Sequence, residues 1–282
     1  MRNTLRPSFV LAVLLAATPV AAEPVSPWAR DGAAALRLVD AGRAPEPGAR
    51  LAAIAIRLEP GWKTYWRQPG ASGVPPRFDF TGSSNVAEAR VLFPAPERDA
   101  GEDGVTNVYH GLVTLPVSVK PRDPKAPVDL KLVADYGVCE RICVPVRAEA
   151  DLVLSPDGGA SGPAAEEAQA AAAASPRAAP LGVKGDLGIE AVRQVAGPKG
   201  QAALEIVAAA PAGSDPMLFA ETGEGDYAPA PEPDGAAKDG VSRFRMVFEE
   251  LELPKSGLRL TLAAGGRAVE TAVALDEIAP PH

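Results

Sequence analysis

In Tyr136-Gly137-Val138-Cys139-Glu140-Arg141-Ile142-Cys143-Val144-Pro145 lie both cysteines of this chain of 282 residues. A disulfide needs its two Cα atoms roughly 4.4–6.8 Å apart. Along one extended strand Cys139 and Cys143 would lie about 13 Å apart, because each residue adds about 3.3 Å. A bond between them therefore requires a helical turn or a chain reversal.

The flanking residues favour a chain reversal. Residues 130–136 alternate roughly between apolar and polar side chains, and residues 144–154 form a second β-type run. Two strands joined by residues 140–142 place Cys139 opposite Cys143, and facing residues of an antiparallel pair lie about 4.5–5.5 Å apart. The sequence therefore predicts a β-hairpin whose tip can carry a disulfide.

The spacing alone leaves the use of this disulfide open. A ring this short contributes only ~2 kcal/mol in the chain-entropy estimate, against about 4.7 kcal/mol for a ring of about a hundred residues. A chain of this length also buries a sizeable core without a cross-link. Redox use, a staple at the strand end and two free thiols all remain open, because this spacing is less diagnostic than Cys-x-x-Cys.

The amino-terminal residues predict export. Arg2 and Arg6 precede an apolar run over 9–17, and Val20-Ala21-Ala22 is a small-residue cleavage site, so residues 1–22 have the pattern of a signal peptide. The apolar run is shorter than the about 20 residues that span a bilayer. We expect a soluble periplasmic protein with no membrane insertion after signal cleavage, in a compartment that permits disulfides.

Composition excludes several classes of function. The net charge of −8 becomes −10 once Arg2 and Arg6 are removed, and an acidic surface argues against nucleic acid and anionic lipid as partners. His110 is the only histidine besides His282, so neither a zinc site nor a Ser-His-Asp triad is supported. We expect no cofactor and no resident metal.

Short β-type runs separated by turn signals predict an all-β chain. We expect two immunoglobulin-like antiparallel β-sandwich domains over 23–154 and 182–277, joined by an Ala/Pro/Gly-rich linker over 155–181. Within the linker, residues 164–174 could form two or three helical turns. The predicted strands are 33–39, 50–58, 77–80, 86–93, 112–119, 130–136 and 144–154, then 187–192, 203–207, 216–221, 242–250, 258–263 and 268–275.

Three features of the first domain need separate interpretation. Residues 62–70, which hold two of the three tryptophans, are predicted to be a long loop over the core. The alternative for 62–70 is a wall beside the cysteines or a surface presented to a partner. Residues 94–111 are predicted to be a polar loop. Pro116 predicts an edge position or a bulge for its strand, because proline donates no ladder hydrogen bond.

Several stretches together resemble one family. In chain order they are 61–70, 72–76, 84–85, 93–96, 115–117 and 139–145. They resemble the N-terminal periplasmic region of the DsbD/ScsB thiol-disulfide reductases, closer to the ScsB branch, over roughly residues 30–155. Residues 265–270 are similar to the end of the second sandwich of the ScsB-type region.

The resemblance implies that Cys139 and Cys143 are a redox pair. In that family a membrane-embedded domain reduces this disulfide, and the dithiol then reduces periplasmic disulfide isomerases or related thioredoxin-fold proteins. No membrane region and no thioredoxin domain follow within the 282 residues, so we expect the membrane electron donor to be a separate chain. The family also suggests that Cys139 is the more exposed cysteine.

The resemblance also points to loops near the pair. The enteric branch shields its cysteines with an aromatic cap loop, which would fall near Glu102-Asp103-Gly104, where this chain has no phenylalanine. The residues expected to bind partners beside the pair are Tyr65, Trp66, Glu102, Asp103, Tyr109, Tyr136 and Arg141.

Two functions from different classes are therefore compared. The first is a periplasmic thiol-disulfide interchange protein that passes electrons through Cys139 and Cys143 to thioredoxin-fold partners, which would make it a protein-disulfide reductase. The second is a non-enzymatic module that binds a partner or handles Cu(I), a soft ion for which thiolates are suitable ligands.

Overall fold

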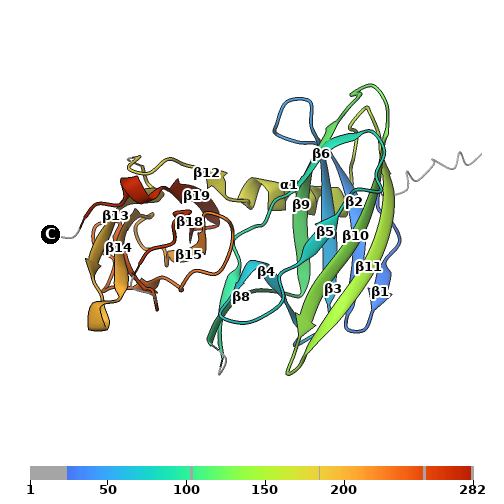
Figure 1. Cartoon of the computed structure of the whole chain (residues 1–282). Helices are drawn as coiled ribbons and strands as arrows, with labels where there is room; N and C mark the ends of the chain where they lie inside the picture. Colours follow the sequence, from blue (N-terminus) through green and yellow to red (C-terminus); the bar gives the residue numbers. More distant parts are fainter. Residues whose placement is uncertain (1–23, 102–103, 184, 250–251, 281–282) are drawn as a thin grey trace, which may run out of the picture.

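The computed structural model describes residues 24–101, 104–183, 185–249 and 252–280. The chain forms two β-sandwich lobes with one helix near their junction (Figure 1). The all-β prediction is confirmed, since antiparallel sheets make up most of both lobes. The predicted signal peptide lies outside the described residues. Within the described ranges, no helix has the length and apolar character needed to cross a membrane.

The first sandwich packs a five-stranded sheet, ordered β1-β2-β3-β9-β6, against a sheet ordered β11-β10-β4-β8-β7 with β5 on β10. Alternate strand residues point into the core, as Leu36 and Leu38 of β2 and Leu130 and Leu132 of β10 do. The strands are β1 (Ala29–Asp31), β2 (Ala34–Arg43), β3 (Arg50–Leu58), β4 (Lys63–Gly70), β5 (Arg77–Asp79), β6 (Val86–Val91), β7 (Glu97–Gly101), β8 (Gly104–His110), β9 (Leu112–Pro121), β10 (Val128–Cys139) and β11 (Cys143–Leu154).

The second sandwich packs two four-stranded sheets, ordered β12-β19-β18-β15 and β13-β14-β17-β16. Its pairs are antiparallel except for the short parallel pair β12–β19. Two 3₁₀ turns, Pro198–Gly200 and Leu275–Glu277, complete it. The strands are β12 (Arg177–Ala178), β13 (Gly188–Ala196), β14 (Ala202–Ala209), β15 (Met217–Thr222), β16 (Glu232–Pro233), β17 (Val241–Val247), β18 (Leu258–Ala264) and β19 (Arg267–Val273).

The predicted helical turns between the sandwiches are present as α1 (Pro163–Ala174). Proline at the first turn suits a helix start, because its missing N–H would have no partner there. Ala164, Ala165 and Ala168 are buried, two of them in a cluster with the outer face of the five-stranded sheet. Gln169 Nε2 also donates to the Ala41 carbonyl at 2.9 Å. The connecting segment is therefore docked on the first sandwich, while the predicted domain limits remain a prediction.

Two stretches predicted to be loops are strands. Residues 62–70 contain β4, inside the six-stranded sheet, and residues 94–111 contain β7 and β8. The prediction for residues 62–70 was wrong because Pro69 and Gly70 lie at an irregular stretch of a strand rather than in a loop. β4 pairs with β8 at Tyr65↔Val108 and next at Gly70↔Thr106, so four residues oppose one. We call residues 66–69 the β4 bulge.

The prediction for Pro116 was also wrong, because β9 lies between β3 and β6. The Pro116 carbonyl accepts a hydrogen bond from the Leu92 N–H at 2.7 Å, one residue past the end of β6. The N–H and C=O of a strand residue point to the same side. The N–H that proline lacks would therefore face the point where β6 has ended, and an interior strand tolerates proline there.

Tyr136→Phe is expected to leave the free energy of unfolding unchanged or to raise it by up to about 1 kcal/mol. The Tyr136 hydroxyl is buried and has no hydrogen-bond partner among the described residues, so removing it leaves no partner unsatisfied. Tyr109→Phe is the matched control: that hydroxyl donates to the Pro94 carbonyl at 2.6 Å, and its loss should cost about 1–2 kcal/mol. Urea unfolding of the three proteins measures both values.

The stability of the protein and of these two variants should also depend on pH in the alkaline range. Burial raises the pKa of Tyr136 and of Tyr109 above the ordinary tyrosine value, which is near 10 in the unfolded chain. Above about pH 10 the folded protein therefore binds more protons than the unfolded chain, and stability falls as pH rises further. Tyr136→Phe should weaken this alkaline loss. An unchanged alkaline slope, or a marked loss of stability at pH 7, would contradict the assignment of an unpartnered hydroxyl.

Candidate functional site

The predicted hairpin is present with the predicted register. β10 and β11 pair from Val128↔Leu154 to Cys139↔Cys143, so the two cysteines close the ladder at its tip. Their sulfurs form a disulfide, and their Cα atoms are 4.2 Å apart. No free cysteine is present. The bond joins two neighbouring strands that are already paired along their full lengths.

The two sulfur-bearing residues differ sharply in exposure. Cys139 is 3% exposed, whereas Cys143 is exposed together with the rest of the hairpin tip. The expectation that Cys139 is the more accessible cysteine was therefore wrong. The reason is that Cys139 ends a strand inside the sheet, paired with Lys63 of β4, while Cys143 begins the edge strand β11.

Tyr65 of β4 contacts both sulfurs. Its hydroxyl lies 2.9 Å from Cys139 Sγ and 3.2 Å from Cys143 Sγ. Disulfide sulfurs carry no hydrogen, so the hydroxyl is the donor in both contacts. Burial raises the pKa of Tyr65 above its ordinary value, which keeps the hydroxyl protonated at neutral pH. A thiolate at either sulfur would accept this hydrogen bond more strongly than the disulfide does.

A short glycine-containing segment covers the tyrosine ring. Gly73 has φ of +114°, and a Cβ at this position would lie 2.4 Å from the Tyr65 ring. A Cβ on Gly137 of β10 would likewise lie 2.9 Å from the Cβ of Val74. Both glycines permit close approach of backbone to a neighbour. Residues 73–74 therefore pack directly over Tyr65 and β10 beside the disulfide.

Charged residues flank the site on β4, β7 and β8. Lys63 Nζ donates to Asp99 Oδ2 at 2.6 Å, and Lys63 is paired in the sheet with both Cys139 and His110. His110 Nδ1 lies 3.2 Å from Glu97 Oε2. The cation nearest the pair in the ladder is therefore held by a carboxylate. Within the described ranges no group of three or more His, Cys, Asp and Glu side chains is arranged to bind a metal.

The structure brings some predicted binding residues to the disulfide and not others. Tyr65 contacts it, and Arg141 lies exposed on the same hairpin tip. Trp66 is fully buried and packs on Phe219 of the second sandwich at 5.8 Å between ring centroids. Tyr109 and Tyr136 belong to the core of the first sandwich. Glu102 and Asp103 lie outside the described residues.

Sequence reasoning missed several residues of the site. Lys63, Gly73 and Val74 lie in the stretches that carry the family resemblance, so that resemblance was an available signal. Val108, which forms a small buried cluster with Tyr65 and Cys139, and Asp99 lie in a segment predicted to be a loop. No signal in the sequence indicated that this segment forms strands beside the pair.

Comparison with known proteins agrees with this geometry. Residues 36–155 match the family model described as "Thiol:disulfide interchange protein DsbD, N-terminal". The crystal structure of the N-terminal periplasmic domain of ScsB from Proteus mirabilis superimposes with a TM-score of 0.66 at 20% identity, covering 92% of this chain and 99% of that chain. The likeness therefore includes both sandwiches and shows the shared fold.

Two further results complete the comparison. The reduced N-terminal domain of DsbD from Neisseria meningitidis has a TM-score of 0.25 at 18% identity, covering 49% of this chain and 87% of that chain. A search of the curated proteins found no significant match. Residues 36–155 thus resemble the N-terminal region of DsbD, and the chain shares its fold with the ScsB domain. The family match and the disulfide support thiol-disulfide interchange as the general class of chemistry.

Tyr65→Phe is expected to slow reduction of the disulfide by dithiothreitol at pH 7 about tenfold. A hydrogen bond to an anionic group contributes about 1.5–3 kcal/mol, and about 1.4 kcal/mol corresponds to a factor of ten in rate. Tyr109→Phe, which removes a buried hydroxyl that does not touch sulfur, is the control. Stopped-flow traces of both variants supply the rates, and equal rates for Tyr65→Phe and the unchanged protein would exclude Tyr65 from the exchange reaction.

Proposed function

We propose that this protein is a periplasmic thiol-disulfide interchange protein, which passes electrons through Cys139 and Cys143 to thioredoxin-fold partners. The observation that carries the proposal is the arrangement of an exposed Cys143 bonded to a buried Cys139 beneath a tyrosine hydroxyl. The predicted signal peptide and the periplasmic origin of the ScsB domain support the location. We further propose a membrane electron donor as the source of reducing equivalents, as the resemblance implies.

The unequal exposure supports a different role for each cysteine. A partner thiolate attacks Cys143 Sγ, the disulfide breaks, and a mixed disulfide forms between Cys143 and the partner. Cys139 leaves as a thiolate, which accepts the Tyr65 hydrogen bond and then a proton. The partner's second cysteine thiolate then attacks the partner's first sulfur in the mixed disulfide, which forms the partner's disulfide and releases Cys143 as a thiolate. Two electrons and two protons have then passed from the partner dithiol to this protein.

The reverse sequence reduces a substrate disulfide. Cys143 thiolate attacks one sulfur of the substrate disulfide, and the second substrate sulfur leaves as a thiolate. Cys139 thiolate then attacks Cys143 Sγ, which re-forms the Cys139–Cys143 disulfide and releases the first substrate sulfur as a thiolate. The two sulfurs are held on facing strands, so the resolving step needs no rearrangement of the sheet. The short ring also means that opening the bond costs the fold little, since a ring of this size contributes only ~2 kcal/mol.

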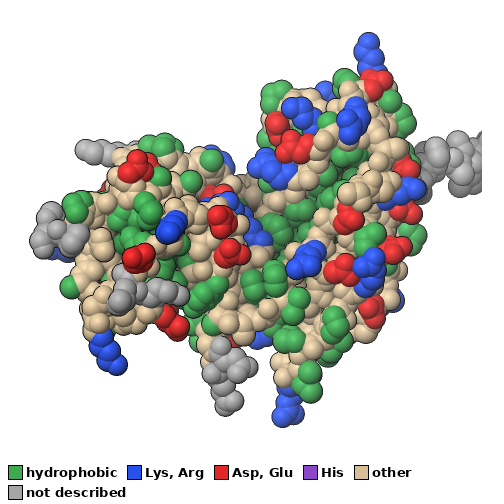
Figure 2. All heavy atoms as spheres, in the orientation of Figure 1, with side chains coloured by type: hydrophobic (Ala, Val, Ile, Leu, Met, Phe, Trp, Pro, Cys, Tyr) green, Lys and Arg blue, Asp and Glu red, His purple; other side chains and the backbone are tan. Residues whose placement is uncertain are grey.

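The surface around Cys143 suits a protein partner. Ile142 is 77% exposed, Val144 43% and Val74 46%, and all three lie beside the hairpin tip. Exposed apolar side chains that gather around a reactive group indicate an interaction site, whereas single ones need no explanation. In the view of Figure 2, basic and acidic side chains are interspersed over both lobes. The apolar tip, rather than a field of one charge sign, is therefore the proposed docking surface.

Cys139→Ser is expected to trap a covalent partner. It leaves the exposed Cys143 thiol to form a mixed disulfide that no second cysteine can resolve. Cys143→Ser, the matched control, leaves only the buried Cys139 thiol and should trap little. Adducts formed in periplasmic extract are identified by mass spectrometry, with a thioredoxin-fold protein joined through its Cys-x-x-Cys cysteine as the expected product. Equal trapping by both variants would contradict the assigned roles.

The reduction potential gives an independent check. A value above about −300 mV is expected for a pair in exchange, because structural disulfides of exported proteins lie below that value. Equilibration of the purified protein with glutathione or dithiothreitol buffers measures it. A potential well below this limit, together with no trapped partner, would make the bond a structural staple.

Ile142→Asp is expected to slow exchange with the trapped partner at least about fivefold, because truncating a central apolar contact of an interface costs more than about 1 kcal/mol. The rate with dithiothreitol should stay within about twofold. Val153→Asp is the control on the same strand: Val153 is 62% exposed but lies near the opposite end of β11. Equal slowing by both variants would place the docking surface elsewhere.

A further inference from the structure

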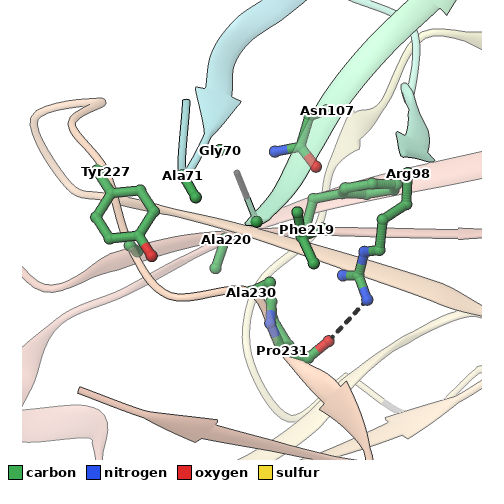
Figure 3. A pocket seen from close by; sticks show the side chains of 12 residues that line it. Gly70, Ala71, Arg98, Asn107, Phe219, Ala220, Tyr227, Ala230 and Pro231 are labelled. Carbon is green, nitrogen blue, oxygen red and sulfur yellow. Dashed lines mark hydrogen bonds between the residues drawn. The ribbon is translucent and has the colours of Figure 1, made fainter. Parts of the chain in front are cut away.

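Two arginines of the first sandwich bind residues of the second sandwich through their guanidinium groups. Arg67 of β4 donates through Nε to Glu221 Oε2 at 3.0 Å and through Nη2 to Glu270 Oε2. Arg98 of β7 donates through Nη2 to the Leu218 carbonyl at 2.6 Å and through Nη1 to the Pro231 carbonyl at 3.1 Å. Figure 3 shows the Arg98 guanidinium reaching Pro231 next to Phe219, at the edge of a cavity between the lobes.

The contact of Arg67 is largely buried. Glu221 is 1% exposed and also accepts from Arg259 Nη1 at 2.7 Å. We call Arg67, Glu221, Arg259 and Glu270 the Arg67 network. The Arg67 guanidinium also stacks over the Trp66 ring at 4.6 Å. A buried carboxylate that is paired on two sides fixes its partners closely, because separating them leaves an uncompensated buried charge.

The Arg67 network meets the first sandwich at its least regular point. Trp66 and Arg67 lie in the β4 bulge, where regular pairing with β8 stops directly after Tyr65. Inside the bulge, Gln68 is held by Asn107, whose Nδ2 donates to the Gln68 carbonyl at 3.0 Å. A bulge re-aims the side chains around it. Side-chain contacts, rather than ladder hydrogen bonds, therefore hold β4 just after Tyr65. For Arg67 these contacts are with Glu221 and Glu270 of the second sandwich.

β7 connects the same two places. Arg98 binds the second sandwich, and its neighbour Asp99 binds Lys63. Lys63 is paired in the sheet with Cys139. β4 thus runs from the contact with the second sandwich to the disulfide within two residues, from Arg67 to Tyr65. β7 is linked to Cys139 only through the ion pair of Asp99 with Lys63.

We propose that the second sandwich is a positioning element for the redox pair: through the Arg67 network it holds the β4 bulge so that the Tyr65 hydroxyl stays within hydrogen-bonding distance of Cys139 Sγ and Cys143 Sγ. Arg67 is then a positioning residue that acts through Tyr65. The inference rests on the proposed function, because the property it controls is the exchange chemistry of this pair. A contact that only joined the lobes would leave that chemistry unchanged.

The test is a double-mutant cycle in the full chain, with Tyr65→Phe, Arg67→Gln and the combined variant. Arg67→Gln should slow reduction by dithiothreitol about three- to tenfold, the range expected for a residue that acts through a neighbour. In the Tyr65→Phe background the same substitution should change the rate less than about twofold, because coupled positions are non-additive. Arg67→Lys, which retains one charge contact, should give an intermediate rate.

Two further variants keep the test decisive. Glu270→Gln is the milder substitution, since Glu270 is partly exposed, and it should slow reduction in the same direction if Arg67→Gln fails to fold. Arg267→Gln is the matched control: it removes a 2.7 Å ion pair with Asp186 inside the second sandwich and should leave the rate unchanged. Fully additive effects of Tyr65→Phe and Arg67→Gln, or a faster reaction in Arg67→Gln, would overturn the proposal.

The outcome is independent of partner capture. The rate with a small thiol reports on the geometry around the sulfurs, whereas trapping through Cys143 reports on a protein partner. An unchanged rate in Arg67→Gln and Glu270→Gln, with a partner still trapped by Cys139→Ser, would remove the positioning role and leave the proposed function intact. A slowed rate with no trapped partner would support the positioning role and contradict the proposed exchange with a protein partner.

Discussion

The full-length pairing of β10 with β11 is the constraint on which the site depends. One register places Cys139 opposite Cys143 at the tip and fills the core with the alternate residues of β10. A shift of one residue would turn every side chain of β11 to the other face and would move Cys143 away from its partner. The same hydrophobic alternation that builds the sandwich therefore also sets the distance between the sulfurs.

The position of β10 inside the sheet makes the two cysteines chemically different. β10 has neighbours on both sides, so β4 brings Tyr65 over Cys139, while β11 leaves Cys143 at an edge. In the proposed exchange, an incoming thiolate meets only Cys143 Sγ, and Cys139 Sγ leaves toward the Tyr65 hydroxyl. The proposed direction of attack follows from sheet order and requires no additional charged group next to the sulfurs.

The parts of the structure that could be predicted from the sequence are those fixed by local pattern. The hairpin follows from a spacing of four and two alternating flanks, and most strands of the second sandwich follow from alternation such as that of 243–248. β4 could not be predicted in this way, because it carries Pro69 in its bulge and Gly70 directly after it. The contact of Tyr65 with the sulfurs joins residues 74 and 78 positions apart, and no local pattern encodes such a pair.

The sequence alone could predict neither the exposure of the cysteines nor the contacts of the second sandwich with β4, for a related reason. Which cysteine is covered depends on which strand pairs next to β10, and that order is a property of the assembled sheet. Arg67, Glu221 and Glu270 are ordinary charged residues of predicted strands or loops until the two lobes meet. A buried carboxylate between two arginines is costly to assemble and adds little net stability compared with apolar packing. Its placement beside the bulge that adjoins Tyr65 supports the proposed role in the geometry at the sulfurs rather than a role in the stability of the contact between the lobes.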